Sequence, residues 1–112
     1  MLTIYHNPRC SKSRQTLQLI EQANKDVTIV EYLKKPLNIV QIEELIGLLN
    51  ISPIEMMRTK EEDFKALSLK HANDEQLVQA MAAHPKLIER PIVTSENSAI
   101  IGRPPENVLA LL

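Results

Sequence analysis

Hydrophobic positions in the first third of the chain follow the pattern of a strand, a helix and a second strand. Residues 2–5 form a short, partly continuous apolar run, which is typical of a buried strand. In the segment 11–23 the apolar residues recur at helical spacing, and the β-branched run 27–32 then predicts a second strand. Two strands joined by a crossover helix predict a βαβ unit with parallel strands.

The middle of the chain predicts a group of helices. After Asn38, apolar residues at positions 42, 45, 46 and 49 fall on one helix face. Four helix-start signatures lie in this region: Asn38 with Gln41, Ser52 with Glu55, Thr59 with Glu62, and Asn73 with Gln76. The pair His84-Pro85 is interpreted as the stop of the last of these helices.

The end of the chain predicts a hairpin and a final helix. Residues 91–94 and 99–101 are interpreted as antiparallel strands because only a short turn, 95–98, separates them. Pro104-Pro105-Glu106 then opens a helix. The order βαβ, helices, ββα predicts an α/β protein of thioredoxin-like fold. We expect a four-stranded mixed sheet flanked by helices, a helical insertion between strands 2 and 3, and a single domain over residues 1–112.

Composition and charge exclude several classes of function. The 13 basic and 14 acidic residues give a net charge of −1, so we expect no general attraction to nucleic acid or to anionic membranes. No apolar stretch approaches the ~20 residues of a membrane span, and no signal peptide is visible. A single cysteine cannot form an intramolecular disulfide, and we therefore expect a cytoplasmic protein, most simply a monomer.

That single cysteine, Cys10, is the candidate nucleophile. It lies between the first predicted strand and the first predicted helix, directly after Pro8 and Arg9. A thiol at this junction faces the unpaired N–H groups of the first helical turn and the positive end of the helix dipole, which favour the thiolate. The same N–H groups suit a bound oxyanion. The alternative for a free cysteine is a small buried hydrophobic side chain.

Four segments combine this cysteine with arginines, histidines and prolines: residues 4–14, 58–60, 84–93 and 102–104. Together they resemble the glutaredoxin-coupled arsenate reductase family, in the order expected along the whole chain. The resemblance implies that Cys10 attacks arsenate and that Arg58, Arg90 and Arg103 hold the oxyanion. It also implies glutathione as co-substrate, glutaredoxin as partner, no bound cofactor, and a cis bond between Arg90 and Pro91. Arg9 departs from the family, which commonly has a small residue at that position.

Several neighbouring residues are expected to support the site. His6 is interpreted as a group that orients the loop or tunes the thiolate, and not as a general base, because a lowered cysteine pKa makes a base unnecessary. Ser13, Arg14 and Pro91 complete this supporting set. We expect no metal site, because His71 and His84 have no partner ligands at metal-binding spacing.

Two other functions stay open. A thiol enzyme could act on a different oxyanion or on a glutathione mixed disulfide, because the arginines specify only an anionic group. Alternatively, the chain could be a binding module, since transcription regulators of the Spx type share the fold and the early cysteine segment and bind RNA polymerase. Those regulators usually carry a Cys-x-x-Cys switch, however, and here the second position is Ser13.

Overall fold

The chain divides into two compact units, which the computed structural model describes over residues 1–112. The first unit comprises residues 1–35 and 90–112, and the second comprises residues 36–89. The helical insertion predicted between strands 2 and 3 therefore forms a unit with its own core, and the two chain ends build the sheet.

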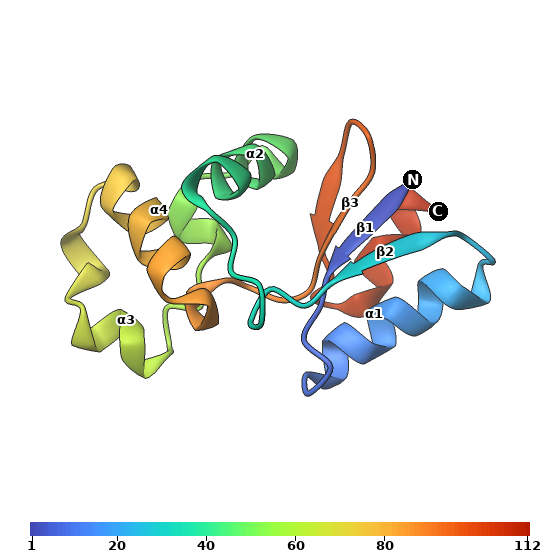
Figure 1. The fold of residues 1–112 in the computed structure, drawn as a ribbon, viewed down its shortest axis with the longest axis horizontal. Helices are drawn as coiled ribbons and strands as arrows, with labels where there is room; N and C mark the ends of the chain where they lie inside the picture. Colours follow the sequence, from blue (N-terminus) through green and yellow to red (C-terminus); the bar gives the residue numbers. More distant parts are fainter. The chain divides into compact units, whose positions relative to one another are not determined.

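The first unit is built on a mixed sheet of four strands (Figure 1). The strands are β1 (Leu2–Tyr5), β2 (Val27–Val30), β3 (Ile92–Thr94) and β4 (Ala99–Ile101), in the spatial order β2-β1-β3-β4. β1 pairs in parallel with β2, whereas β1 with β3 and β3 with β4 are antiparallel. The predicted βαβ unit, hairpin and thioredoxin-like layout are confirmed.

Helix α1 (Ser11–Gln22) and the 3-10 helix η4 (Pro105–Leu111) pack against each other and against this sheet. The final helix predicted from the sequence is thus a 3-10 helix. Alternation along β1 buries every second side chain. The resulting core consists of five buried apolar residues: Leu2, Ile4, Ile20, Val93 and Val108.

The register of the sheet sets where functional loops meet. Tyr5, the last residue of β1, pairs with Val30 at the end of β2 and with Ile92 at the start of β3. The segments after β1, after β2 and before β3 therefore all leave the sheet at the same end of its strands. Cys10 and Arg90 both belong to these segments.

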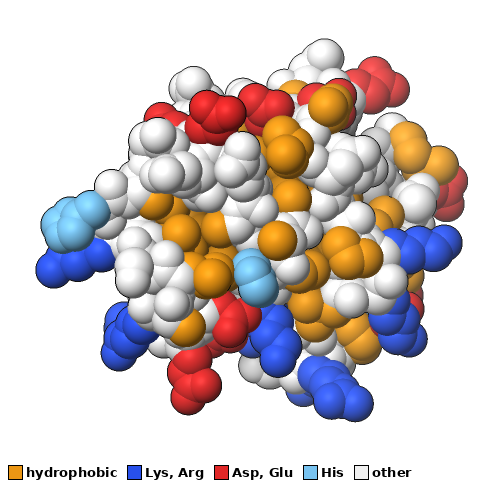
Figure 2. Space-filling model, turned by 60° about the vertical axis from the view of Figure 1, so that its left-hand side comes forward, with side chains coloured by type: hydrophobic (Ala, Val, Ile, Leu, Met, Phe, Trp, Pro, Cys, Tyr) orange, Lys and Arg blue, Asp and Glu red, His pale blue; other side chains and the backbone are white.

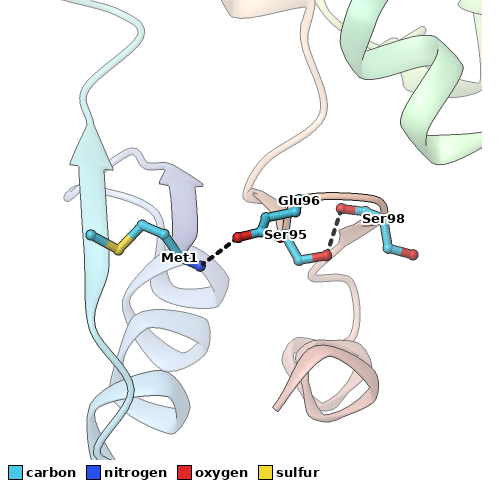
Figure 3. A network of polar contacts seen from close by, with 4 residues as sticks. All are labelled: Met1, Ser95, Glu96 and Ser98. Atoms are coloured by element: carbon cyan, nitrogen blue, oxygen red, sulfur yellow. Dashed lines mark hydrogen bonds and ion pairs between the residues drawn. The ribbon is translucent and has the colours of Figure 1, made fainter.

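The hairpin turn between β3 and β4 lies at the opposite end of the strands (Figure 3). Ser95 Oγ donates to Ser98 O at 3.3 Å, and the amino-terminal nitrogen of Met1 lies 4.0 Å from Glu96 Oε1. Both groups of that ion pair are mostly exposed to solvent, so it stabilises the fold by at most about 1 kcal/mol. This end of the unit is held together mainly by its strand pairing.

The second unit is helical. Its elements are α2 (Ile39–Leu49), η1 (Pro53–Met56), α3 (Glu62–Ala66), η2 (Leu69–His71), α4 (Asp74–Ala83) and η3 (Pro85–Leu87). The capping boxes of Asn38 with Gln41 and Asn73 with Gln76 form in both directions, with bonds of 2.8 to 2.9 Å. Each satisfies two orphan N–H groups, which fixes where α2 and α4 begin.

The helix start predicted at Thr59 is wrong. The N-cap of α3 is Glu61, and its side chain makes no capping bond. The N–H of Glu61 instead donates to Arg58 O at 3.1 Å, so residues 58–61 form a turn before the helix. Phe64, on α3, is buried, and the helix begins at Glu62.

Packing of α2 on α4 forms the core of the second unit. Ile42 and Leu45 come from α2, and Leu77 and Met81 come from α4; all four are buried. A bridge between Met57 and Ile88 joins the segment after η1 to the last residues of the unit.

The surface carries both signs of charge, and Figure 2 shows acidic, basic and hydrophobic side chains on the same face. This distribution agrees with the net charge of −1. None of the helices has the length and apolar character that a membrane crossing requires.

Candidate active site

Cys10 is the N-cap of α1 and has extended backbone angles, φ −92° and ψ 122°. Its own N–H donates to Asn7 O at 3.0 Å, and its carbonyl accepts from the N–H of Arg14 at 3.0 Å. The loop therefore makes a tight turn immediately before the helix. No side chain caps α1, so the first N–H groups of the helix stay available to the sulfur or to an anion.

The thiol of Cys10 is half-buried and has a lowered pKa. Burial acts to raise this pKa, but hydrogen bonds outweigh it. The donors are the backbone N–H of Ser13, the side chain of Arg90 and the backbone N–H of Lys12, and the charge of Arg90 adds to them. The helix start and a guanidinium thus stabilise the same thiolate, as the position at a strand-to-helix junction predicts.

Arg90 lies between the second unit and β3, directly before the buried Pro91. Burial acts to lower the pKa of the Arg90 guanidinium, but the nearby Cys10 sulfur and the Tyr32 side chain outweigh this effect and raise the pKa. The Nε atom of Arg90 is buried and has no partner. The bond between Arg90 and Pro91 is cis, as the family resemblance implies.

Arg103 approaches the same place from the end of β4. Its Nη1 donates to the carbonyl oxygen of Arg90 at 3.3 Å, and its bond to Pro104 is also cis. This approach requires Gly102, since a Cβ there would lie 2.6 Å from Thr16 Oγ1 and 2.9 Å from Pro91 Cγ. Two of the three predicted arginines therefore lie together in the first unit.

Arg58, the third predicted arginine, belongs to the second unit. Its backbone N–H donates to Leu87 O at 2.7 Å, next to the bridge between Met57 and Ile88. Its side-chain Nε is buried without a partner. Its contact with an oxyanion held at Cys10 stays a prediction.

The predicted supporting residues His6 and Ser13 form a buried network with Asn7. His6 Nδ1 lies 2.6 Å from Ser13 Oγ, and the N–H of Asn7 donates to the same oxygen at 3.0 Å. All three residues are less than 8% exposed. Burial lowers the pKa of His6, and the charge of Arg14 lowers it further, against Glu31 and Glu21, which raise it. A neutral histidine that orders the loop agrees with a supporting role.

Arg14 is not one of the three arginines that are predicted to bind the oxyanion. It is exposed, and its Nη1 donates to Pro8 O at 3.0 Å, which ties the first turn of α1 to the loop before Cys10. The N–H of Arg9 donates to Asn7 Oδ1 at 3.0 Å.

Sequence reasoning missed two residues of this site, Asn7 and Tyr32. Asn7 accepts hydrogen bonds from the N–H groups of both Arg9 and Cys10, and an Asn before a proline is a recognisable turn signal. Tyr32 lies in the predicted strand 27–32, but β2 ends at Val30, and the buried Tyr32 side chain contributes to the raised pKa of Arg90.

The site combines the stabilised thiolate of Cys10, the permanent positive charge of Arg90 and the N–H groups of the first turn of α1. An incoming group with negative oxygens would be attracted to the cation and the N–H groups, while the sulfur can attack its central atom. The two arginines of the first unit can offer paired N–H donors to such oxygens.

Comparisons with known proteins show the family of this chain. Residues 5–111 match the model of the ArsC family. The uncharacterized protein YfgD of Escherichia coli strain K12 is 46% identical over 112 residues, which cover 97% of this chain and 94% of that protein. An arsenate reductase of Haemophilus influenzae is 45% identical, with 97% of each chain covered.

A solved structure of an arsenate reductase from Vibrio cholerae superposes with a TM-score of 0.95 and 45% identity, covering 99% of this chain and 97% of that one. These matches extend over nearly the whole sequence. The chain therefore belongs to the ArsC family and has its thioredoxin-like fold.

Proposed function

We propose that this protein reduces arsenate to arsenite, with Cys10 as the nucleophile, glutathione as co-substrate and glutaredoxin as the partner that completes turnover. The observation that carries the proposal is the place of Cys10 at the start of α1, where the first N–H groups of the helix and the Arg90 guanidinium lower the pKa of the thiol. The whole-length similarity to proteins named arsenate reductase supports the choice of substrate.

Binding of the oxyanion would use positive groups that already surround the sulfur. Arg90 comes just before β3 and Arg103 just after β4, and Arg103 donates to the carbonyl oxygen of Arg90. The N–H groups of the first turn of α1 lie at the sulfur itself. Arg58 is the predicted third guanidinium. A guanidinium has five N–H donors, so Arg90 can hold the sulfur and an oxygen of the substrate at the same time.

The first chemical step is attack of the Cys10 thiolate on As(V). A sulfur–arsenic bond forms, and one arsenate oxygen takes up a proton and leaves as water. No protein base is needed, because the sulfur is already stabilised as thiolate by the groups that lower its pKa. The guanidinium groups neutralise the charge on the remaining oxygens, which is stronger in a partly desolvated site.

Glutathione then attacks the Cys10 sulfur of the adduct: a disulfide forms between Cys10 and glutathione, the sulfur–arsenic bond breaks, and arsenic keeps the electron pair and leaves as arsenite. A glutaredoxin thiol then takes the glutathione from this mixed disulfide, so that Cys10 returns as a thiolate. Over one cycle arsenic gains two electrons, two glutathione thiols become one disulfide, and one oxygen leaves as water. The chain has only one cysteine, so the resolving thiol must come from another molecule.

The test is release of arsenite by the purified protein with arsenate, glutathione and glutaredoxin. We expect turnover that Cys10→Ser abolishes and that Asn97→Ala, in the exposed hairpin turn, leaves unchanged. Arsenite release no faster than in the absence of the protein would refute the proposal.

A second arm distinguishes the related thiol activity. The same protein is given a small glutathione mixed disulfide in place of arsenate, and release of glutathione is followed. Turnover of the disulfide without any reduction of arsenate would assign the site to thiol exchange. The Spx-like alternative has less support, because Ser13, at the position of the second switch cysteine, is engaged in the buried bonds with His6 and Asn7.

A further inference from the structure

A groove lies between helices α2 and α4 of the second unit. Its volume is about 560 Å³, within the range of roughly 300 to 1,000 Å³ that is usual for binding clefts. Much of its lining is apolar: Ile39 and Ile46 come from α2, Pro53 begins η1, and Val78 comes from α4. Ile39 is 42% exposed, so the groove presents apolar surface to solvent.

The rim of this groove is acidic. Glu43 of α2 and Asp74 and Glu75 of α4 line it, and all three side chains are exposed and make no ion pair. The two helices contain no Lys, Arg or His, so with Glu44 they carry a net charge of −4, whereas the whole chain has −1. Asp74 and Glu75 also favour the start of α4 through the helix dipole, but Glu43 lies in the interior of α2, where the dipole gives it no such role.

Gly47 is a residue of α2 that the fold does not require. Its φ is not positive, and a Cβ placed on it would meet no atom within 4 Å. A glycine inside a helix is less favourable than any residue except proline, so α2 loses stability here without a gain in packing or backbone geometry. Gly47 belongs to the lining of the groove, where a larger side chain would enter the open space. The glycine therefore keeps the groove open.

We propose that this groove binds a helix of a partner protein that carries apolar side chains at positions i and i+4 with Lys or Arg beside them. The lining of α2 runs from Ile39 to Gly47, which gives a length of about 12 Å, or two helical turns. Two apolar side chains one turn apart would cover the apolar lining, and the basic side chains would meet the carboxylates of the rim. The proposal goes beyond the proposed function and uses none of the residues of the candidate active site.

The groove suits a helix better than the other occupants. Its two main walls are helices whose backbone groups are already bonded within each helix, so they offer no hydrogen bonds to an extended segment. A small cation would leave the apolar lining uncovered. A second copy of this chain offers Lys12 and Arg14 on α1, but the apolar side chains of that helix already pack in the core of the first unit.

The test uses synthetic helical peptides of about 15 residues, which is long enough for a helix to form. The basic probe has Leu at i and i+4 with Lys beside them; one control peptide has Glu for each Lys, and the other has Ala for each Leu. NMR of the ¹⁵N-labelled full-length protein follows the amides of its two glycines, Gly47 in the groove and Gly102 in the first unit. We expect only the basic probe to move the Gly47 amide, in a saturable manner, and Gly102 to stay unmoved.

Two variants test the apolar and the acidic part of the groove separately, by fluorescence anisotropy of the labelled basic probe. Gly47→Leu should keep α2 folded, because leucine favours helix and its Cβ meets no atom, and it should abolish binding by filling the groove. Glu43→Lys should weaken binding by about 3- to 10-fold. Glu44→Lys is the matched control, since it makes the same charge change on the next residue, outside the lining, and should weaken binding by less than about 2-fold at physiological salt.

An unmoved Gly47 amide, or equal shifts with the basic probe and either control peptide, would overturn the proposal. Binding to Gly47→Leu as tight as to the wild type would do the same. Sedimentation of the protein alone tests the second copy: a concentration-dependent dimer that Gly47→Leu abolishes would assign the groove to self-association and refute a partner helix. None of these measurements involves arsenate, so their outcome is independent of the proposed function.

Discussion

Ser13→Ala is the sharpest test of how the loop before Cys10 is held. The Ser13 hydroxyl is fully buried and bonds to His6 Nδ1 at 2.6 Å and to the N–H of Asn7 at 3.0 Å. The alanine variant leaves both groups buried in a site with no replacement partner. Each unsatisfied buried group costs about 1 to 3 kcal/mol.

The higher helix propensity of alanine offsets roughly 0.5 kcal/mol of this cost. We therefore expect Ser13→Ala to lower the free energy of unfolding by about 2 to 5 kcal/mol, a large share of the ~5 to 15 kcal/mol of an ordinary domain. At this chain length the melting temperature should fall by roughly 8 to 20 °C.

Urea unfolding followed by circular dichroism measures this change, since the chain has no tryptophan for fluorescence. Ser11→Ala is the matched control, because Ser11 is exposed on the first turn of the same helix and its loss should cost less than about 0.5 kcal/mol. If the two variants differ by less than that amount, the buried network does not stabilise the loop and the reasoning is refuted.

Three further predictions concern pH dependence, helix capping and the two glycines. The pKa of His6 is lowered in the folded protein, so its contribution to stability is complete above the unfolded value of about 6.5 and is lost as pH falls through the folded pKa. Urea unfolding at pH values between about 5 and 8 should show the free energy of unfolding falling as the pH is lowered. His6→Gln should make this pH dependence smaller. Asn73→Ala removes the N-cap of α4 and should cost about 1 kcal/mol by urea unfolding, and a loss below 0.3 kcal/mol would contradict the observed capping box. Gly102→Ala should cost roughly 1 to 3 kcal/mol and weaken arsenate binding, because its Cβ meets Thr16 Oγ1 at 2.6 Å, whereas Gly47→Ala, in α2 with no atom within 4 Å, should stabilise by about 0.5 to 1 kcal/mol; equal effects of the two alanines would refute the steric argument.

The local sequence determined most of the elements. Apolar and β-branched runs predict strands, and β1, β2, β3 and β4 all form, although β2 ends at Val30 and not at residue 32. The caps at Asn38 and Asn73 were predicted because their hydrogen bonds involve residues only three positions apart. At Thr59 the same local signature failed, because the chain forms a turn over residues 58–61 and α3 begins at Glu62.

The candidate site, too, could be predicted from the local sequence only in part. The place of Cys10 at the start of a helix follows from its immediate neighbours, and a helix start by itself favours a thiolate. Arg90 and Arg103 are separated from Cys10 by tens of positions, and no local pattern brings a guanidinium to the sulfur. Only the strand pairing of β1 with β2 and β3 does so, because hydrogen bonds across a sheet join residues that the sequence keeps far apart.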